Sequence, residues 1–214
     1  MSDLPGESPD SADSVPQPLT PLSGLTVLQN NLLKFFLFSL LIFVGGCIGG
    51  YLVSAAEPTF GESLLTFFQE NVVKYIMDPD PSVVASRLFM NNLETCVLLY
   101  LGGCIAGIVP FFVIAFNGVV FGAIIEVVQK KTGEMVMLAA IIPHGVFELP
   151  AVLVSAALGL LLGKAIIEEM VGVGDAAFEG ARLSIIFITY VIPFIAFSAF
   201  MEAFITPAIL QMVT

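Results

Sequence analysis

The chain has 214 residues, of which 57% are hydrophobic and 12% charged, and its mean hydropathy is +1.00. These values exclude a water-soluble domain of this size, and they predict an integral membrane protein without a large soluble enzyme domain. The net charge of −11, from 7 Lys and Arg against 18 Asp and Glu, argues against nucleic acid as a partner.

The chain begins with a segment unlike the rest. Residues 1–31 are rich in Ser, Pro and Asp and contain no Lys or Arg. Such a segment cannot bury enough apolar surface to offset its ordering entropy, so we predict a disordered acidic tail. Residues 32–214 then form the transmembrane helical domain. Its first span is predicted at 32–56, and “GGCIGG” within it contains two GxxxG pairs that would let another helix approach closely.

The connection at residues 57–92 contains an amphipathic segment. In “SLLTFFQENVVKYIM”, the apolar residues Leu64, Phe68, Val72 and Ile76 recur at four-residue intervals, which places them on one helical face. We therefore expect a helix that lies on the membrane surface or against the bundle.

Residues 95–125 contain no charged side chain, and Pro110 divides this run. Two spans joined tightly at the proline are therefore predicted, at 93–109 and 111–128. Each span has one pair of glycines at four-residue spacing, which would stack on one helix face and contact a neighbouring helix. The four glycines are Gly103, Gly107, Gly118 and Gly122.

The stretch “IIPHGVFELPA” places a histidine and a glutamate inside the apolar span predicted at 135–164. His144 and Glu148 are four residues apart, but Pro143 and Pro150 each remove a helical hydrogen-bond donor. We therefore expect two half-helices that meet at a break between the two prolines.

A last span is predicted at 183–205. The fold class is therefore all-α, a polytopic membrane helix bundle of about five transmembrane helices, one of them broken at Pro143–Pro150. We expect a multi-pass protein of the cell membrane with the lipid bilayer as its surroundings. Lys and Arg are divided almost evenly between the two sides, so the positive-inside rule does not set the orientation.

Polar side chains within the spans or at their ends form the candidate site. The candidates for an intramembrane polar cluster are Asn92, Asn117, His144, Glu148 and Glu202, with Glu126 as a further polar residue. We expect His144 and Glu148 to point into the protein, with Asn117 and Glu202 as their best partners. Two interpretations stay open. The cluster is either a polar plug that satisfies backbone groups of the broken helix, or a site that binds a cation, relays protons or accepts a substrate.

No complete catalytic or metal-binding motif accompanies these residues. His144 is the only histidine, and with Glu148 it would supply two ligands where a structural metal needs more. There is no H-E-x-x-H and no G-x-S-x-G motif. The three cysteines lie in apolar runs and are expected to be small buried residues rather than a disulfide or a metal site. We therefore expect no metal, no cofactor and no enzymatic activity.

Four segments together carry a likeness to a known family: “NNLETCVLLYLGGCIAGIVP”, “FNGVVFGAIIEVV”, “IIPHGVFELPA” and “FMEAFITP”. Over about residues 30–210 the chain resembles the stage II sporulation protein M family of integral membrane proteins. The matching positions are Asn92, the N-G-x-x-x-G at Asn117, Gly118 and Gly122, the P-H-G-x-x-E-x-P signature from Pro143 to Pro150, and Glu202 with Pro207.

The resemblance implies a fold with about five spans. In spore-forming bacteria the namesake anchors a complex with cell-wall hydrolases that drives engulfment. Many relatives occur in bacteria and archaea that never form spores, and the P-H-G-x-x-E signature is typical of this wider branch. The low isoelectric point and acidic tail suit an archaeon, so sporulation itself is not implied.

Two functions from different classes are therefore in view. The first is a non-enzymatic membrane scaffold that organises membrane or extracytoplasmic protein partners, with the polar residues serving the structure. The second is a small transporter or channel-like protein that uses the polar cluster as a path. An enzyme ranks third, because no catalytic set is complete.

Overall fold

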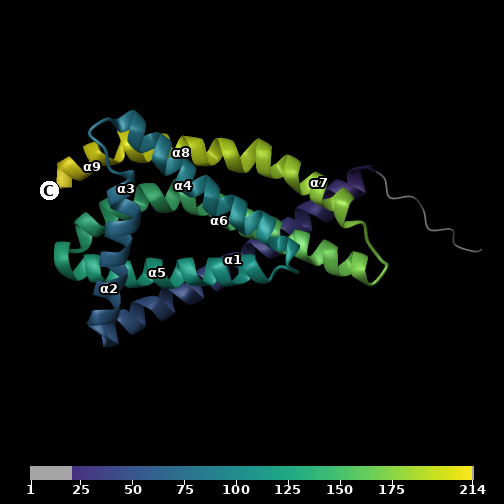
Figure 1. Ribbon diagram of the computed structural model, residues 1–214, viewed down its shortest axis with the longest axis horizontal. Helices are drawn as coiled ribbons and strands as arrows, with labels where there is room; N and C mark the ends of the chain where they lie inside the picture. Colours follow the sequence, from purple (N-terminus) through teal and green to yellow (C-terminus); the bar gives the residue numbers. More distant parts are fainter. Residues whose placement is uncertain (1–20, 214) are drawn as a thin grey trace, which may run out of the picture.

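The computed structural model describes the backbone of residues 21–213 and the side chains of residues 28–138, 146, 148–208 and 211. Over these residues the protein is a bundle of long helices without a strand (Figure 1). Residues 1–20, most of the predicted tail, lie outside the described residues. Residues 21–31 are helical, which corrects the predicted end of the tail, and Pro21 suits the first turn of a helix because it needs no backbone donor there.

Long helices alternate with shorter ones along the described chain. They are α1 (Pro21–Ala56), α2 (Pro58–Phe68), α3 (Lys74–Ile76), α4 (Pro81–Leu101), α5 (Ile108–Thr132), α6 (Glu134–Met170), α7 (Ala176–Ile186), α8 (Ile192–Phe204) and α9 (Thr206–Val213). One π-helical turn at Gln69–Val73 joins α2 to α3, and another at Phe187–Val191 joins α7 to α8. The chain therefore runs from α7 into α8 as one rod.

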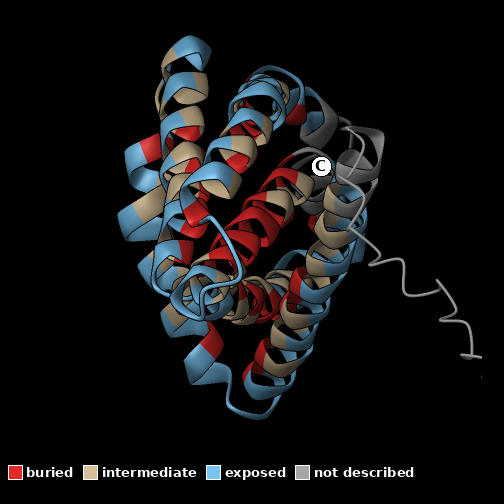
Figure 2. Ribbon diagram, turned by 90° about the vertical axis from the view of Figure 1, so that its right-hand side faces the viewer, coloured by how far each residue is buried: buried red, intermediate tan, exposed pale blue. Residues whose placement is uncertain are grey.

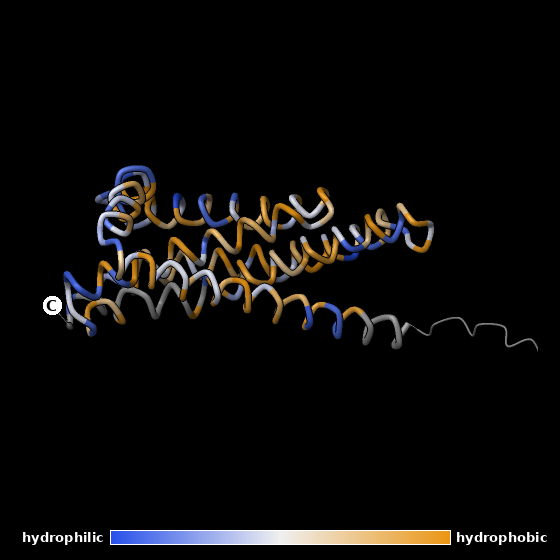
Figure 3. The backbone as a smooth tube through the Cα atoms, turned by 90° about the horizontal axis from the view of Figure 1, so that it is seen from below, coloured by the Kyte–Doolittle hydropathy of each residue, from blue (hydrophilic) through white to orange (hydrophobic). Residues whose placement is uncertain are grey.

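Four described stretches are long and apolar enough to cross a membrane: Leu28–Ala56, Ile108–Thr132, Glu148–Met170 and Ala176–Ala208. Apolar residues follow the middle of these long helices (Figure 3). α4 runs beside them, and its 21 residues reach about 30 Å, although Arg87 and Glu94 make it more polar. The protein is therefore a polytopic membrane helix bundle. The sequence predicted about five spans, and α4 occupies the position of one of them.

The long helices alternate in direction. α1, α5 and the α7–α8 rod run one way along the bundle, and α4 and α6 run the other way (Figure 1). Five passes along the bundle leave the start of α1 and the end of α8 at opposite ends of the bundle (Figure 1).

α2 and α3 run crosswise at one end of the bundle (Figure 1). The predicted apolar face is the face turned toward the other helices, because Leu64, Phe68 and Val72 are half-buried and Ile76 is buried. The amphipathic pattern therefore predicted both the helix and the side that packs.

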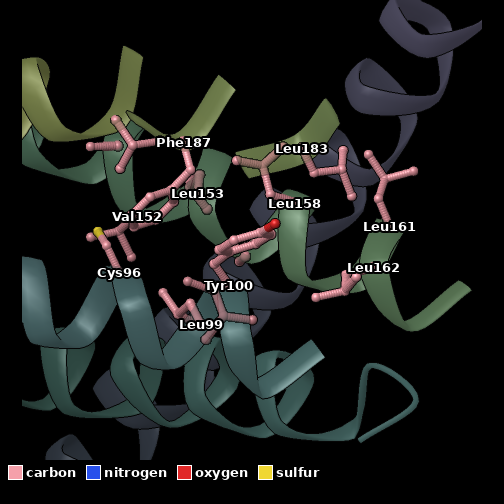
Figure 4. Packing of buried hydrophobic residues seen from close by; sticks show 14 of the residues in the cluster. Cys96, Leu99, Tyr100, Val152, Leu153, Leu158, Leu161, Leu162, Leu183 and Phe187 are labelled. Carbon is pink, nitrogen blue, oxygen red and sulfur yellow. The ribbon is translucent and has the colours of Figure 1, made fainter. Parts of the chain in front are cut away.

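α6 is the central helix of the bundle (Figure 2). Of its most apolar 18-residue stretch 72% is buried, against 11% for α1, which marks α1 as a peripheral helix. Around α6 the core side chains of α4 and of the α7–α8 rod interdigitate with its own (Figure 4). Tyr100 of α4 stacks on Phe187 and donates a hydrogen bond to the Gly180 carbonyl at 2.9 Å, which ties α4 to α7.

Pro143 and Pro150 do not interrupt α6, which is helical from Glu134 to Met170. This corrects the prediction of two half-helices. The chain changes direction within α6, between its first turns beside the end of α5 and its long remainder (Figure 1). A proline inside a helix removes one hydrogen bond and crowds the preceding turn, and a bend accommodates both without ending the helix.

Pro110 does not form the junction between α4 and α5. The turn occupies residues 102–107, where Ala106 (φ +49°) and Gly107 (φ +77°) adopt left-handed backbone conformations. α5 begins at Ile108, so Pro110 lies in its first turn, where the missing N–H costs no helical hydrogen bond. The first of the two predicted spans therefore lies further toward the N-terminus, at Pro81–Leu101. The second extends beyond its prediction at both ends, at Ile108–Thr132, because the proline starts a helix here instead of ending one.

Candidate intramembrane polar site

A hydrogen bond between α4 and α6 joins two residues of the predicted cluster. The Asn92 side-chain amide donates to Glu148 Oε2 at 2.6 Å, and both side chains are buried. The Asn91 amide donates to Asn92 Oδ1 at 3.2 Å, which leaves the Asn92 nitrogen to face the carboxylate. A buried polar group without a partner is costly, so this bond favours the observed contact of the two helices.

The pair borders a closely packed apolar interior. Cys96, one turn after Asn92, is fully buried and lies beside the hydroxyl of Ser155 in α6. That hydroxyl donates to the Ala151 carbonyl of its own helix at 2.8 Å. Cys96 and Leu99 of α4 lie against α6 (Figure 4). The polar pair therefore lies at the edge of a closely packed apolar contact between helices.

Glu202 lies on the side of α8 that is turned toward the bundle. Ser198 and Ala199, four and three residues earlier, are buried on that side, and α8 contacts both α4 and α6. The Glu202 side chain is half-buried. The buried Ser198 hydroxyl has no hydrogen-bond partner among the described residues. α8 therefore brings a carboxylate and a hydroxyl to the helices that hold the Asn92–Glu148 pair.

Asn117, expected as a partner of Glu148, bonds within its own helix. Its amide donates to the Val113 carbonyl at 2.8 Å, and the side chain is half-buried. An asparagine inside a helix can donate its amide hydrogen bond to a carbonyl of the preceding turn in this way. The sequence does not show whether it forms this bond or one to another helix. The backbone of His144 belongs to α6, but its side chain lies outside the described residues.

Glycines bring α1 and α5 together. A Cβ added at Gly118 or Gly122 would overlap the carbonyl oxygens of Phe43 and Cys47 in α1. The contact is reciprocal, because a Cβ on Gly50 would overlap the backbone of α5. The predicted glycine pair of α5 thus lies directly on the backbone of another helix, a distance that only a residue without a side chain allows.

The other predicted glycine pair lies against α6. A Cβ on Gly103 would overlap the Gly159 carbonyl, and one on Gly163 would overlap the Gly107 backbone. The turn between α4 and α5 therefore rests on α6 through glycines from both sides. A Cβ on Gly159 would also overlap the Leu99 carbonyl, so a glycine also lies between α4 and α6, farther along α6 than the Asn92–Glu148 bond.

A second buried carboxylate lies between α1 and α5. The Ser54 hydroxyl donates to Glu126 Oε2 at 2.8 Å, and Lys130, one turn later in α5, forms an ion pair with the same carboxylate. Gly61 of α2 lies against the Ser54 hydroxyl, so α2 also packs against the Ser54–Glu126 pair. The spacing of Glu126 and Lys130 predicts their ion pair. No sequence signal pairs Ser54 with a residue 72 positions away.

Hydrogen bonding between helices is the chemistry that this arrangement offers. Among the described side chains, no three from His, Cys, Asp and Glu lie close enough to bind a metal ion together. Asn92 and Glu148 supply one donor and one acceptor, and Ser54 and Glu126 repeat this combination at the other helix contact. Each bond joins two helices that are also held by glycines.

A family model described as stage II sporulation protein M matches residues 39–207. The chain is also similar to two uncharacterised proteins of Methanocaldococcus jannaschii. One is 28% identical over 145 residues, which are 65% of this chain and 64% of that relative, and the other is 30% identical over 132 residues, which are 57% and 70%. The chain thus spans less than two thirds of the first relative's length. No solved structure matches. The family match covers well over half of the chain and includes both polar pairs, and the chain therefore belongs to the stage II sporulation protein M family.

Proposed function

We propose that this protein is a non-enzymatic scaffold of the cell membrane that organises membrane or extracytoplasmic partner proteins. The observation that carries this proposal is the Asn92–Glu148 hydrogen bond at the edge of a closely packed interior. A donor and an acceptor that satisfy each other across two helices stabilise one arrangement of those helices. The polar residues then serve the structure, and function belongs to the outer surfaces.

Close backbone contacts support the same conclusion. At the glycines between α1 and α5, and at those between the α4–α5 turn and α6, the backbones approach so closely that an added Cβ would overlap the opposing backbone. A bundle held in this way presents fixed surfaces. Because such surfaces are already ordered, less conformational entropy is lost when a partner binds to them.

The outer face of α1 is a candidate partner surface within the membrane. Leu37, Leu41, Ile48 and Leu52 are exposed on this peripheral helix. At one end of the bundle, the crosswise α2–α3 segment exposes Phe67. Surfaces of this kind suit helices of other membrane proteins, or a domain that rests on the membrane.

Purification from native membranes in a mild detergent tests the scaffold proposal. The tagged wild type should retain a partner at a fixed stoichiometry, and Glu148→Gln should retain the same partner, because glutamine keeps the shape and can accept the Asn92 hydrogen bond. A wild type that purifies alone from membranes cross-linked before extraction would contradict the proposal.

The runner-up is a small transporter or channel-like protein. The observation in its favour is that Glu148 of α6 and Ser198 and Glu202 of α8 are polar side chains on two long helices that pack against each other. A transporter predicts flux that disappears in Glu148→Gln while the purified protein stays folded. A scaffold predicts that the same variant changes neither flux nor partner.

A further inference from the structure

A cavity of about 280 Å³ lies at the end of the bundle opposite α2 and α3. It is bounded by the first part of α1, the last turns of α6, the α6–α7 loop and α7. Leu28, Leu161 and Leu183 line it with apolar surface, and Asn31 adds an amide. The cavity is far from the Asn92–Glu148 pair along the bundle, so it is a separate feature.

Two ion pairs face this cavity from different helices. Lys164 and Glu168 of α6 lie 2.5 Å apart, and Arg182 and Glu179 of α7 lie 2.8 Å apart. Both pairs stay within one helix, so neither crosses the space between α6 and α7. Asp175 adds a third carboxylate, whose oxygen accepts the Phe178 N–H at 2.9 Å. Two cationic side chains and three carboxylates therefore line the same cavity.

Exposed apolar residues surround the charged lining. Ile167, Met170, Val171, Val173 and Phe178 are all exposed in the last turns of α6, the loop and the start of α7. Two apolar stretches long enough to cross a membrane, Glu148–Met170 and Ala176–Ala208, meet at this loop. The loop therefore lies at the boundary of the bilayer, where apolar side chains contact acyl chains and charged ones contact headgroups.

We propose that this cavity binds the headgroup of a phospholipid that carries both a phosphate and a primary ammonium. Lys164 and Arg182 bind the phosphate and join α6 to α7 through it. The ammonium faces the carboxylates, which outnumber the cations and disfavour a headgroup with negative charge alone. The exposed apolar residues of the loop contact the acyl chains. The site goes beyond the scaffold proposal and does not depend on it.

Native mass spectrometry of the detergent-purified protein tests this site. Dioleoyl phosphatidylethanolamine should bind one to one and at least about tenfold more tightly than dioleoyl phosphatidylglycerol, which is about 1.4 kcal/mol. Equal binding of the two lipids, or tighter binding of phosphatidylglycerol, would overturn the proposal. This comparison uses the wild type alone and therefore needs no variant to fold.

Charge variants assign the binding to the cavity. The double variant Lys164→Gln/Arg182→Gln should lose about tenfold in affinity for phosphatidylethanolamine, whereas Lys164→Arg/Arg182→Lys should keep it. Lys74→Gln on α3, at the other end of the bundle, is the matched control and should bind as the wild type does. Unchanged binding in the first double variant would place the lipid elsewhere and overturn the assignment.

A soluble headgroup separates a lipid from a free metabolite. O-phosphoethanolamine, which has the same phosphate and ammonium without acyl chains, should not displace the bound lipid at millimolar concentration, because it lacks the apolar contacts of the loop. Displacement at that concentration would assign the cavity to a soluble phosphate ester and overturn the lipid assignment.

Discussion

The contacts of α1 with α5 and of α4 with α6 bring helices together in different ways. α1 and α5 meet through glycines over the middle of a peripheral helix, and their polar bond, Ser54 to Glu126, lies at its end. α4 and α6 meet at the centre of the bundle, where the Asn92–Glu148 bond lies apart from the glycines of the following turn. The first contact is made mainly by glycines on the opposing backbone. The second combines one such glycine, Gly159 against the Leu99 carbonyl, with a matched pair of buried polar side chains.

The largest effect is expected from Gly50→Leu. The side chain would overlap the Val119 carbonyl of α5, and overpacking of this kind costs about 1–3 kcal/mol of unfolding free energy. Gly49→Leu, one residue earlier, is the matched control, because a Cβ there meets nothing within 4 Å. Thermal unfolding in detergent measures both. Equal melting temperatures would show that the backbone contact of α1 with α5 does not hold the bundle.

Glu148→Leu is expected to have the next largest effect. It leaves the buried Asn92 amide without its carboxylate partner, which costs about 1–3 kcal/mol. Glu148→Gln should cost less, since the amide oxygen can accept the same hydrogen bond. The two variants are compared by thermal unfolding. If they unfold at the same temperature, the polar pair is incidental to the contact of α4 with α6.

Ser54→Ala tests how much the polar bond at the end of the α1–α5 contact contributes to stability, compared with the glycines. The change removes the hydrogen bond to Glu126, which keeps Lys130 as a partner, so the expected loss is about 1 kcal/mol. Ser63→Ala on the exposed side of α2 is the control and should leave the melting temperature unchanged. A loss as large as that of Gly50→Leu would show that polar bonds, more than glycines, hold this peripheral helix.

Deletion of residues 2–20 is expected to have the smallest effect. Their composition predicts no contribution to either helix contact, so the unfolding free energy should change by less than about 0.5 kcal/mol. Size-exclusion chromatography and thermal unfolding measure the result. Loss of the monodisperse protein would mean that this segment takes part in folding.

The glycine spacing predicted which face of α5 packs, but it could not choose between the two overlapping pairs of α1. Gly45 with Gly49 and Gly46 with Gly50 have the same spacing, and only the second pair lies against α5. The choice depends on which way α1 is rotated, and that rotation is set by contacts with residues far away in the sequence. Spacing within one helix carries no information about them.

Of the predicted polar cluster, the described hydrogen bonds join Asn92 and Glu148. Glu148 was expected to be buried, and it is, but its described partner is Asn92 and not Asn117. Asn117 can bond to its own helix, and the sequence does not say whether an asparagine bonds within its helix or to another one. The break predicted between Pro143 and Pro150 was wrong for a related reason, because a proline inside a helix can bend it instead of ending it.

Ion flux in proteoliposomes discriminates most directly between a polar pair that holds helices together and one that forms a path. The purified wild type and Glu148→Gln are reconstituted in parallel, and proton and sodium flux are recorded under an imposed membrane potential. A scaffold predicts that neither protein conducts above protein-free vesicles. Flux in the wild type that disappears in Glu148→Gln, with both proteins equally folded, would contradict the scaffold and establish the path.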